Sequence, residues 1–190
     1  MCHPHKCKCG AHVDALGHHA LSCKLSAGRL PRHAALNDII KRALHTAGIP
    51  SILEPAGLDR GDGKRPDGMT IFPFKQGKCL LWDATCSDTF AQSNVIANAL
   101  EAGTAAQEAE STKIRKYQSL TDRYIFEPLA FETSGVFGPR TRVLVEDIGQ
   151  RISKETAEPK EPAWLKQRLG LAIVRGNAFS VLSCLRQDAF

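Results

Sequence analysis

The sequence contains no uninterrupted apolar run of the roughly 18 residues that a membrane-spanning helix requires. Its first ten residues, MCHPHKCKCG, also lack the apolar stretch of a secretory signal. We therefore expect a soluble, intracellular protein. Aromatic side chains make up only 6% of the 190 residues, so few rings are available to stack on nucleic-acid bases.

Length and composition fit one ordinary globular domain with a small appendage. The 190 residues are 43% hydrophobic, which is enough for one full core and too little for two large domains. Lys and Arg number 25 against 20 Asp and Glu, giving a net charge of +5. This excess favours a polyanionic partner without identifying one.

Cysteine and histidine are crowded at the N-terminus. Four of the seven cysteines and five of the seven histidines fall within the first 23 residues. Because an intracellular compartment keeps thiols reduced, this crowding indicates metal binding and not a disulfide framework. The remaining cysteines, Cys79, Cys86 and Cys184, lie in apolar surroundings and are expected to be small core residues.

Four of these N-terminal residues have the spacing of a tetrahedral zinc site: Cys7, Cys9, His19 and Cys23. A helix beginning within residues 17–22 would let His19 and Cys23 reach the same ion, although His18 is an alternative ligand. Four protein ligands leave no open position for water, so the zinc is expected to be structural. The competing interpretation is a disordered, histidine-rich N-terminus.

The chain divides into three sections: residues 1–25 with the zinc ligands, 28–133 with mixed patterns, and 134–190 with a helical pattern. Helical spacing of apolar residues predicts a helix over 31–48, and residues 91–117 predict another that is interrupted at Gly103. Strands are expected over 49–58, 69–74, 79–86 and 124–133, the second and third forming a hairpin around residues 75–78. The charged, proline-containing stretch 153–162 is expected to be an exposed loop.

Two aspartates of the expected hairpin form the candidate catalytic site. Asp67 directly precedes one strand and Asp83 lies inside the next, where it interrupts an apolar run. A carboxylate in such a run is costly unless it is paired or binds metal. Two close carboxylates would suit Mg²⁺ or Mn²⁺, which could activate a water for attack on a phosphodiester.

Each of these acids also has an ordinary interpretation. Asp67 stands between Pro66 and Gly68, which is typical of a turn, and Asp83 could pair with a neighbouring Arg or Lys. Glu54 is a candidate third acid if its strand lies beside the hairpin, and otherwise belongs to the solvated face of an edge strand.

The helix that follows the hairpin carries polar residues on one face. Glu110, Lys113, Lys116 and Tyr117 recur at three- and four-residue spacing. Such a stripe is usually a solvated surface. A lysine aimed at the aspartates could instead position the attacking water or stabilise charge in the transition state.

Several strings occur in an order that resembles a known family: RHAALNDIIKRAL, GDGKRPDG, LLWDATCSDTF, AE-x-x-K-x-x-KY at 109–117 and RGNA at 175–178. Together with the cysteine and histidine pattern, they resemble the C-terminal region of reverse-transcriptase proteins of site-specific non-LTR retrotransposons. In that region a Cys-Cys-His-Cys knuckle precedes a restriction-like endonuclease. The resemblance covers nearly the whole chain, from Cys7 to about Leu182.

The resemblance implies a mixed α/β fold with a PD-(D/E)XK core of order αβββαβ, an N-terminal zinc knuckle and a C-terminal helical extension. Asp67 and Asp83 would be ligands of a catalytic Mg²⁺ or Mn²⁺, and Glu54 an auxiliary acid. The pattern expects a lysine two residues after Asp83, but Thr85 stands there. Because this lysine can move to the neighbouring helix in related nucleases, Lys113 or Lys116, with Tyr117, is the expected substitute.

The expected activity is metal-dependent nicking of DNA. Arg32 and His33 would contact DNA or support the active site, and Lys64 and Arg65 would add to electrostatic binding, which should weaken with salt. Element RNA is a further possible partner, as is a reverse transcriptase acting in cis in the parent protein or in trans, and a nuclear location is expected. The alternatives are an inactive nucleic-acid-binding module and a remnant of such an element.

Overall fold

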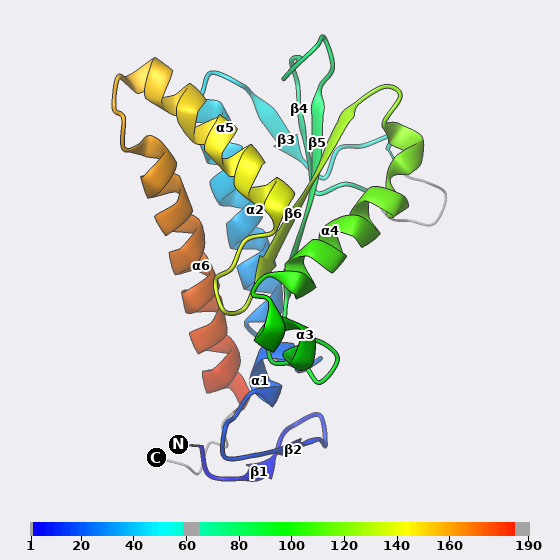
Figure 1. Cartoon of the computed structure of the whole chain (residues 1–190), viewed down its shortest axis with the longest axis vertical. Coiled ribbons are helices and arrows are strands. Elements are labelled where there is room, and N and C mark those ends of the chain that lie inside the picture. The colour runs from blue at the N-terminus through cyan, green and yellow to red at the C-terminus, as the bar shows by residue number, and fades with distance from the viewer. Residues whose placement is uncertain (1, 59–64, 185–190) are drawn as a thin grey trace.

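The chain folds into a four-stranded sheet covered by helices on both faces, with a small Cys/His-rich unit at one end (Figure 1). The computed structural model describes residues 2–58 and 65–184. The described helices are α1 (His19–Ser22), α2 (Arg29–Thr46), α3 (Val95–Leu100), α4 (Thr104–Lys116), α5 (Pro139–Thr156) and α6 (Glu161–Cys184). The predicted mixed α/β class is confirmed.

The main sheet has the strand order β3-β4-β5-β6, in which β3 (Ser51–Leu53), β4 (Gly68–Thr70) and β5 (Leu80–Ser87) are antiparallel neighbours. The last strand, β6 (Ile125–Glu132), runs parallel to β5. The predicted succession of one helix, three strands, a helical segment and a fourth strand is therefore confirmed for the described residues.

The first of these helices, α2, forms as its sequence predicts. Its buried apolar residues Leu36, Ile40 and Leu44 recur at four-residue spacing and face the sheet. The helix ends just before Gly48, which has φ +71°, and the Ile49 N–H then bonds to the Leu44 carbonyl at 2.8 Å. The chain turns directly into β3.

Two strands are shorter than expected. β3 covers only the start of the predicted 49–58 strand because Glu54 adopts a left-handed φ of 50°, which ends the pairing. β4 stops at Thr70, and the predicted hairpin closes through an isolated bridge between Lys75 and Lys78. The break at Gly103, which has φ +98°, separates α3 from α4 as predicted.

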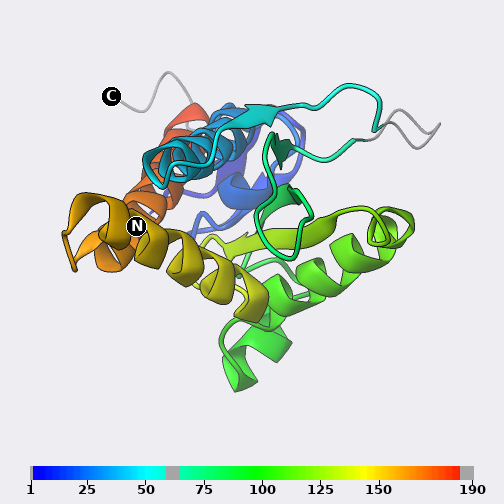
Figure 2. The same ribbon diagram turned by 90° about the horizontal axis from the view of Figure 1, so that it is seen from above.

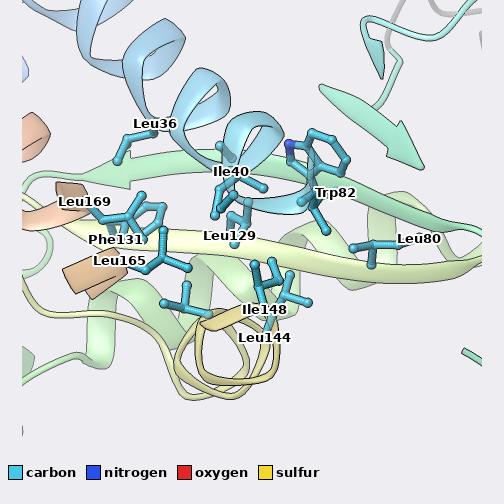
Figure 3. Packing of buried hydrophobic residues seen from close by; sticks show 14 of the residues in the cluster. Leu36, Ile40, Leu80, Trp82, Leu129, Phe131, Leu144, Ile148, Leu165 and Leu169 are labelled. Atoms are coloured by element: carbon cyan, nitrogen blue, oxygen red, sulfur yellow. The ribbon is translucent and has the colours of Figure 1, made fainter. Parts of the chain in front are cut away.

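One face of the sheet is covered by α2 and α5, with α6 packed over both, and the other face by α4 (Figure 2). The larger core lies on the first face, where Leu36 and Ile40 of α2, Leu144 and Ile148 of α5, and Leu165 and Leu169 of α6 meet Leu80, Trp82, Leu129 and Phe131 of the sheet (Figure 3). A smaller cluster around Leu81, Tyr117 and Phe126 lies on the α4 face. Residues 139–184 thus complete the main core.

The loop predicted at 153–162 is shorter than expected. α5 continues to Thr156, Ala157 takes a left-handed φ of 59°, and α6 begins at Glu161. The first four residues of the stretch are therefore helical, because Ser153–Thr156 continue a helix whose face buries Ile148 and Ile152.

The N-terminal unit consists of β1 (His5–Lys6), β2 (His12–Val13) and α1, with the two strands antiparallel. It lies at the C-terminal end of α6 (Figure 1). Cys184 of α6 is buried with Cys7, Val13 and Cys23 of this unit. The expectation that Cys184 is a small buried residue is confirmed, but its neighbours are the N-terminal thiols and not the core on the sheet, since α6 extends past the sheet.

Candidate functional site

The N-terminal unit brings together the four residues predicted as zinc ligands. The ligating atoms of Cys7, Cys9, His19 and Cys23 all lie within 4.8 Å of one another. The Cys7 and Cys23 Sγ atoms are 3.6 Å apart, close to the roughly 3.8 Å expected between two thiolates bound to one tetrahedral zinc. The Cys9 Sγ lies 3.1 Å from the His19 Nε2. This cluster can bind a metal such as zinc.

The structure distinguishes the two adjacent histidines. His18, the alternative ligand, stacks its ring on Phe90 with centroids 4.4 Å apart and an interplanar angle of 11°. Because this ring lies against the loop after β5, it is His19, at the start of α1, that faces the thiols. The expected helix near residues 17–22 places His19 and Cys23 at opposite ends of α1.

Burial also affects the protonation of the cluster. Desolvation, with a further contribution from the neighbouring Cys7 and Cys9 thiols, raises the pKa of Cys23 to about 12, against the lowering effect of the Leu25 backbone N–H. A buried thiol of this kind ionises readily only when a cation compensates its charge. The burial of Cys23 is therefore consistent with a metal-binding role.

A second site is formed where β4 stops pairing with β5. The last paired residue of β4 on this side is Gly68, opposite Trp82 of β5. Asp67 precedes it, and its Oδ2 accepts the backbone N–H of Ala84 at 2.6 Å. The Asp67 carboxylate thus accepts a hydrogen bond that a strand partner would otherwise accept, and it is held against β5 at Ala84, the residue after Asp83.

Asp67 is also bound by the first helix. The His33 Nε2 lies 2.9 Å from the same Oδ2. Burial of Asp67 opposes its ionisation, but the His33 hydrogen bond and charge outweigh this effect, so the pKa of Asp67 is lowered. The same hydrogen bond raises the pKa of His33, with a smaller contribution in that direction from Asp83 and an opposing one from Lys113.

Asp83 is buried and held by two lysines of α4. The Lys113 Nζ lies 2.5 Å from its Oδ1 and the Lys116 Nζ 3.2 Å from its Oδ2, while the Asp83 side chain is only 6% exposed. The Lys113 Nζ also lies 3.4 Å from the Ala84 carbonyl oxygen. The prediction that a lysine of this helix approaches the aspartates is confirmed for Asp83, which both candidates contact.

Tyr117 stands at the end of the same helix and is fully buried. Its hydroxyl donates to the Arg65 carbonyl at 2.9 Å and lies 2.5 Å from the Lys116 Nζ. Lys116 is therefore fixed between Asp83 and Tyr117. Glu110, predicted on the same face, instead accepts the Thr141 N–H at 2.8 Å and so caps the start of α5.

Glu54 and Arg65, two further predicted site residues, lie beside this centre. Glu54 follows β3, its N–H bonds to the Asp67 carbonyl at 2.8 Å, and its largely exposed carboxylate pairs with Arg65. That pairing matches the solvated edge-strand alternative, and its role as an auxiliary acid stays a prediction. Lys64 lies outside the described residues.

Arg32 occupies a different environment from the one expected. Its side chain is buried, at 3% exposure, and its guanidinium donates to the Asn177 Oδ1 at 2.6 Å. Asn177 in turn donates to the Thr133 carbonyl at 2.6 Å. Because Arg32 points into the α2–α6 interface, it joins two helices and does not present a DNA-contacting surface. His33, one position further, is the residue that reaches the candidate site.

Two supporting residues were not identified from the sequence. The buried Asn37 accepts the Trp82 indole N–H at 2.9 Å, and its amide nitrogen lies 3.4 Å from the His33 ring nitrogens. Gly68 lies flat on Trp82, since a Cβ there would stand 2.0 Å from the ring. The four-residue spacing of His33 and Asn37 was the available signal for the first.

No protein-family model matches the chain, and comparison with curated proteins finds no match. Within residues 2–58 and 65–184, no helix has the length and apolar character needed to cross a membrane.

Proposed function

We propose that the chain is a metal-dependent DNA endonuclease domain that nicks a phosphodiester, with the PD-(D/E)XK core that its sequence resembles. The observed order of one helix, three strands, a helical segment and a parallel fourth strand supports this assignment. The retrotransposon resemblance gives the expected context, in which DNA is the substrate and a reverse transcriptase lies in the parent protein or acts in trans. A nuclear location belongs to the same proposal.

One observation carries the proposal: two aspartates and a lysine from three separate segments of the chain meet around Ala84. Asp67 binds its N–H at 2.6 Å, Lys113 lies 3.4 Å from its carbonyl oxygen, and Asp83 is the residue before it. Burying the negative charge of Asp83 inside a strand costs free energy, and the ammonium groups of Lys113 and Lys116 compensate this charge. A nuclease whose catalytic lysine has moved to the neighbouring helix requires that lysine to lie beside the two aspartates, as Lys113 does beside Asp83.

The donor set fits a hard divalent cation. Asp67 and Asp83 supply carboxylate oxygens, the donor type preferred by Mg²⁺ and Mn²⁺, while the one imidazole at this place among the described contacts, His33, is bonded to Asp67. Asp67 and Asp83 would hold the ion, with water and phosphate oxygens completing its shell. A bound ion would supply Lewis-acid polarisation of the phosphate.

The chain's own residues have distinct tasks in this proposal. Lys113 places an ammonium beside both Asp83 and the β5 backbone, where it can position an attacking water and stabilise negative charge on the phosphate. His33 orients Asp67, and Asn37 fixes the His33 ring. Lys116 and Tyr117 hold the other side of Asp83.

A second candidate function is binding of nucleic acid without cleavage. The observation in its favour is that both oxygens of Asp83 already bind ammonium groups, as in a structural ion pair. In that case the N-terminal unit and the basic surface would hold DNA or RNA, while the aspartates would serve only to stabilise the fold.

A plasmid-nicking assay with Mg²⁺ tests the proposal. We expect the wild type to convert supercoiled plasmid to nicked circles and Asp83→Asn to reduce the rate by at least about 10²-fold, because the neutral amide cannot hold the cation. Asp147→Asn is the matched control, since Asp147 pairs with Arg151 at 3.1 Å on the distant α5.

The outcomes separate the two functions. Cleavage by the wild type and by Asp147→Asn, with none by a folded Asp83→Asn protein, supports the nuclease. Equal plasmid binding by all three proteins with no cleavage at any Mg²⁺ or Mn²⁺ concentration overturns it and favours the binding module.

A further inference from the structure

A groove lies between α2 and α6, on the side of α2 that faces away from the aspartates. Its volume is about 620 Å³, within the roughly 300–1,000 Å³ range of small-ligand sites. At 100° per residue, the α2 residues that line it, among them Ala35, Asp38 and Arg42, point opposite to His33 and Asn37. The groove is therefore separate from the candidate catalytic site.

The groove is strongly basic. Arg42 and the buried Arg32 line it from α2, Arg168 and Arg175 line it from α6, and Asp38 is the one acid among the lining residues. Arg168 and Arg175 are both exposed and stand seven residues, or two turns, apart on one helix. A guanidinium fork matches the oxygens of a phosphate, so the lining favours a polyanionic occupant.

Two of these three exposed arginines take part in ion pairs. Arg42 pairs with Asp38 four residues away, and both side chains are largely exposed, so the pair contributes little and can open. The Arg168 guanidinium binds the Glu161 carboxylate at 2.8 Å, and half of the Arg168 side chain stays exposed. For Arg175, no ion pair occurs with any residue in the described part of the chain.

The floor of the groove adds apolar and aromatic surface. Phe179, 49% exposed, and Leu171, 56% exposed, stand beside the small residues Ala35 and Ala172. An exposed ring among arginines is the combination with which proteins hold single strands, the base stacking on the ring and the phosphates binding the cations. A duplex keeps its bases paired inside the helix and could not use Phe179 in this way.

We propose that the α2–α6 groove binds single-stranded nucleic acid, with phosphates held by Arg42, Arg168 and Arg175 and a base stacked on Phe179. This binding does not depend on cleavage at the aspartates and needs no divalent cation. It gives the protein a second contact with nucleic acid, behind α2, which could hold a displaced or frayed strand while a duplex lies elsewhere.

Fluorescence anisotropy with a labelled oligothymidylate of roughly 12 nucleotides tests the proposal in Mg²⁺-free buffer. The double variant Arg168→Gln/Arg175→Gln should weaken binding at least about tenfold and reduce the slope of log affinity against log salt by about 1.4. Phe179→Ala should weaken binding roughly 5- to 150-fold through lost stacking.

The matched control is Arg142→Gln, which removes an exposed arginine of α5 outside the groove lining. It should retain nearly wild-type affinity, and an unchanged melting temperature should show that each variant is folded. Because no plasmid is cut in this experiment, the result is independent of the nuclease assay.

Three results would overturn the proposal. The first is wild-type affinity for the oligothymidylate in the double arginine variant; if that variant instead loses binding of a helical, glutamate-rich peptide, the groove is a protein-docking site. The second is equal losses of affinity in the double variant and in Arg142→Gln. The third is weaker binding of a duplex of equal length by the double variant, combined with no effect of Phe179→Ala on the oligothymidylate.

Discussion

Lys113 and Lys116 contact the same carboxylate but have different surroundings. Lys113 lies 2.5 Å from Asp83 and also reaches the Ala84 carbonyl. Lys116 lies farther from Asp83, at 3.2 Å, and its ammonium stands 2.5 Å from the Tyr117 hydroxyl and 4.3 Å from the centre of that ring. Lys116 is thus engaged by buried neighbours, whereas Lys113 is directed at the site itself.

We therefore expect Lys113→Ala to abolish nicking, with a rate loss of at least about 10²-fold, while plasmid affinity stays nearly unchanged. A single phosphate contact among many contributes little to affinity, but a group acting on the transition state controls the rate. Rates and binding of the folded variant, measured side by side, check this.

Lys116→Ala is the comparison for Lys113→Ala. It should lower the melting temperature more, because it removes the contacts to both Asp83 and Tyr117. If Lys116→Ala loses cleavage while Lys113→Ala keeps the wild-type rate, the assignment of the catalytic lysine to Lys113 is wrong.

At the residue scale, the sequence was informative wherever chemistry and spacing coincided. Asp83 could be singled out because a charge in an apolar run needs compensation, and the lysines because they lie one turn apart. The four-residue spacing of His33 and Asn37 places both on one face of α2, but it does not predict the hydrogen bond that Asn37 accepts from the Trp82 indole, 45 positions away. The burial of Cys184 was likewise predictable, whereas its thiol neighbours lie at the other end of the chain.

At the scale of elements, the order of helices and strands was predictable and their ends were not. The periodicity of apolar residues predicted α2, and the glycine at position 103 predicted that the helical segment after β5 is divided in two. The end of β3 depends on the left-handed Glu54, a backbone conformation without a sequence signature at that residue. The α5 end at Thr156 reflects packing of Ile152 that outweighs the polar composition of its last turn.

The contact between α2 and α6 depends on a glycine. A Cβ at Gly176 would lie 2.5 Å from the Cβ of Arg32, whereas one at Gly170, on the same helix, would meet no heavy atom within 4 Å. We expect Gly176→Ala to destabilise the protein by about 1–3 kcal/mol through overpacking. Gly170→Ala should stabilise it by about 0.5–1 kcal/mol, because alanine is the better helix former.

Urea unfolding of the two variants and the wild type measures this difference. Equal effects of the two substitutions would show that α6 does not approach α2 as closely as the structure has it. The comparison also explains the RGNA string at 175–178, in which Gly176 allows the approach and Asn177 binds Arg32 and the Thr133 carbonyl.

At the scale of the whole molecule, α6 connects the core to the Cys/His unit. Its N-terminal half buries Leu165 and Leu169 in the main core, and its last residue, Cys184, is buried beside Cys7 and Cys23. The Cys184 carbonyl lies 3.0 Å from the His5 Nε2, and the Ser183 hydroxyl accepts the Ala27 N–H at 3.2 Å. Cysteine side chains form most of the unit's buried cluster, which contains few other apolar residues, so we expect a bound metal to stabilise it.

We accordingly expect one zinc per chain, and expect its removal to affect both ends of the protein. Chelation should abolish hydrogen-exchange protection in residues 2–25 and reduce it in 178–184, since the end of α6 loses its packing partners. Protection around Leu36 and Phe131 should persist, because α2, α5 and the sheet bury that core without the N-terminal unit.

Elemental analysis and hydrogen-exchange mass spectrometry measure these effects before chelation, after chelation and after zinc is restored. Less than stoichiometric zinc in protein purified without chelators would refute the metal site, and unchanged protection of 178–184 after complete zinc removal would refute the coupling to α6.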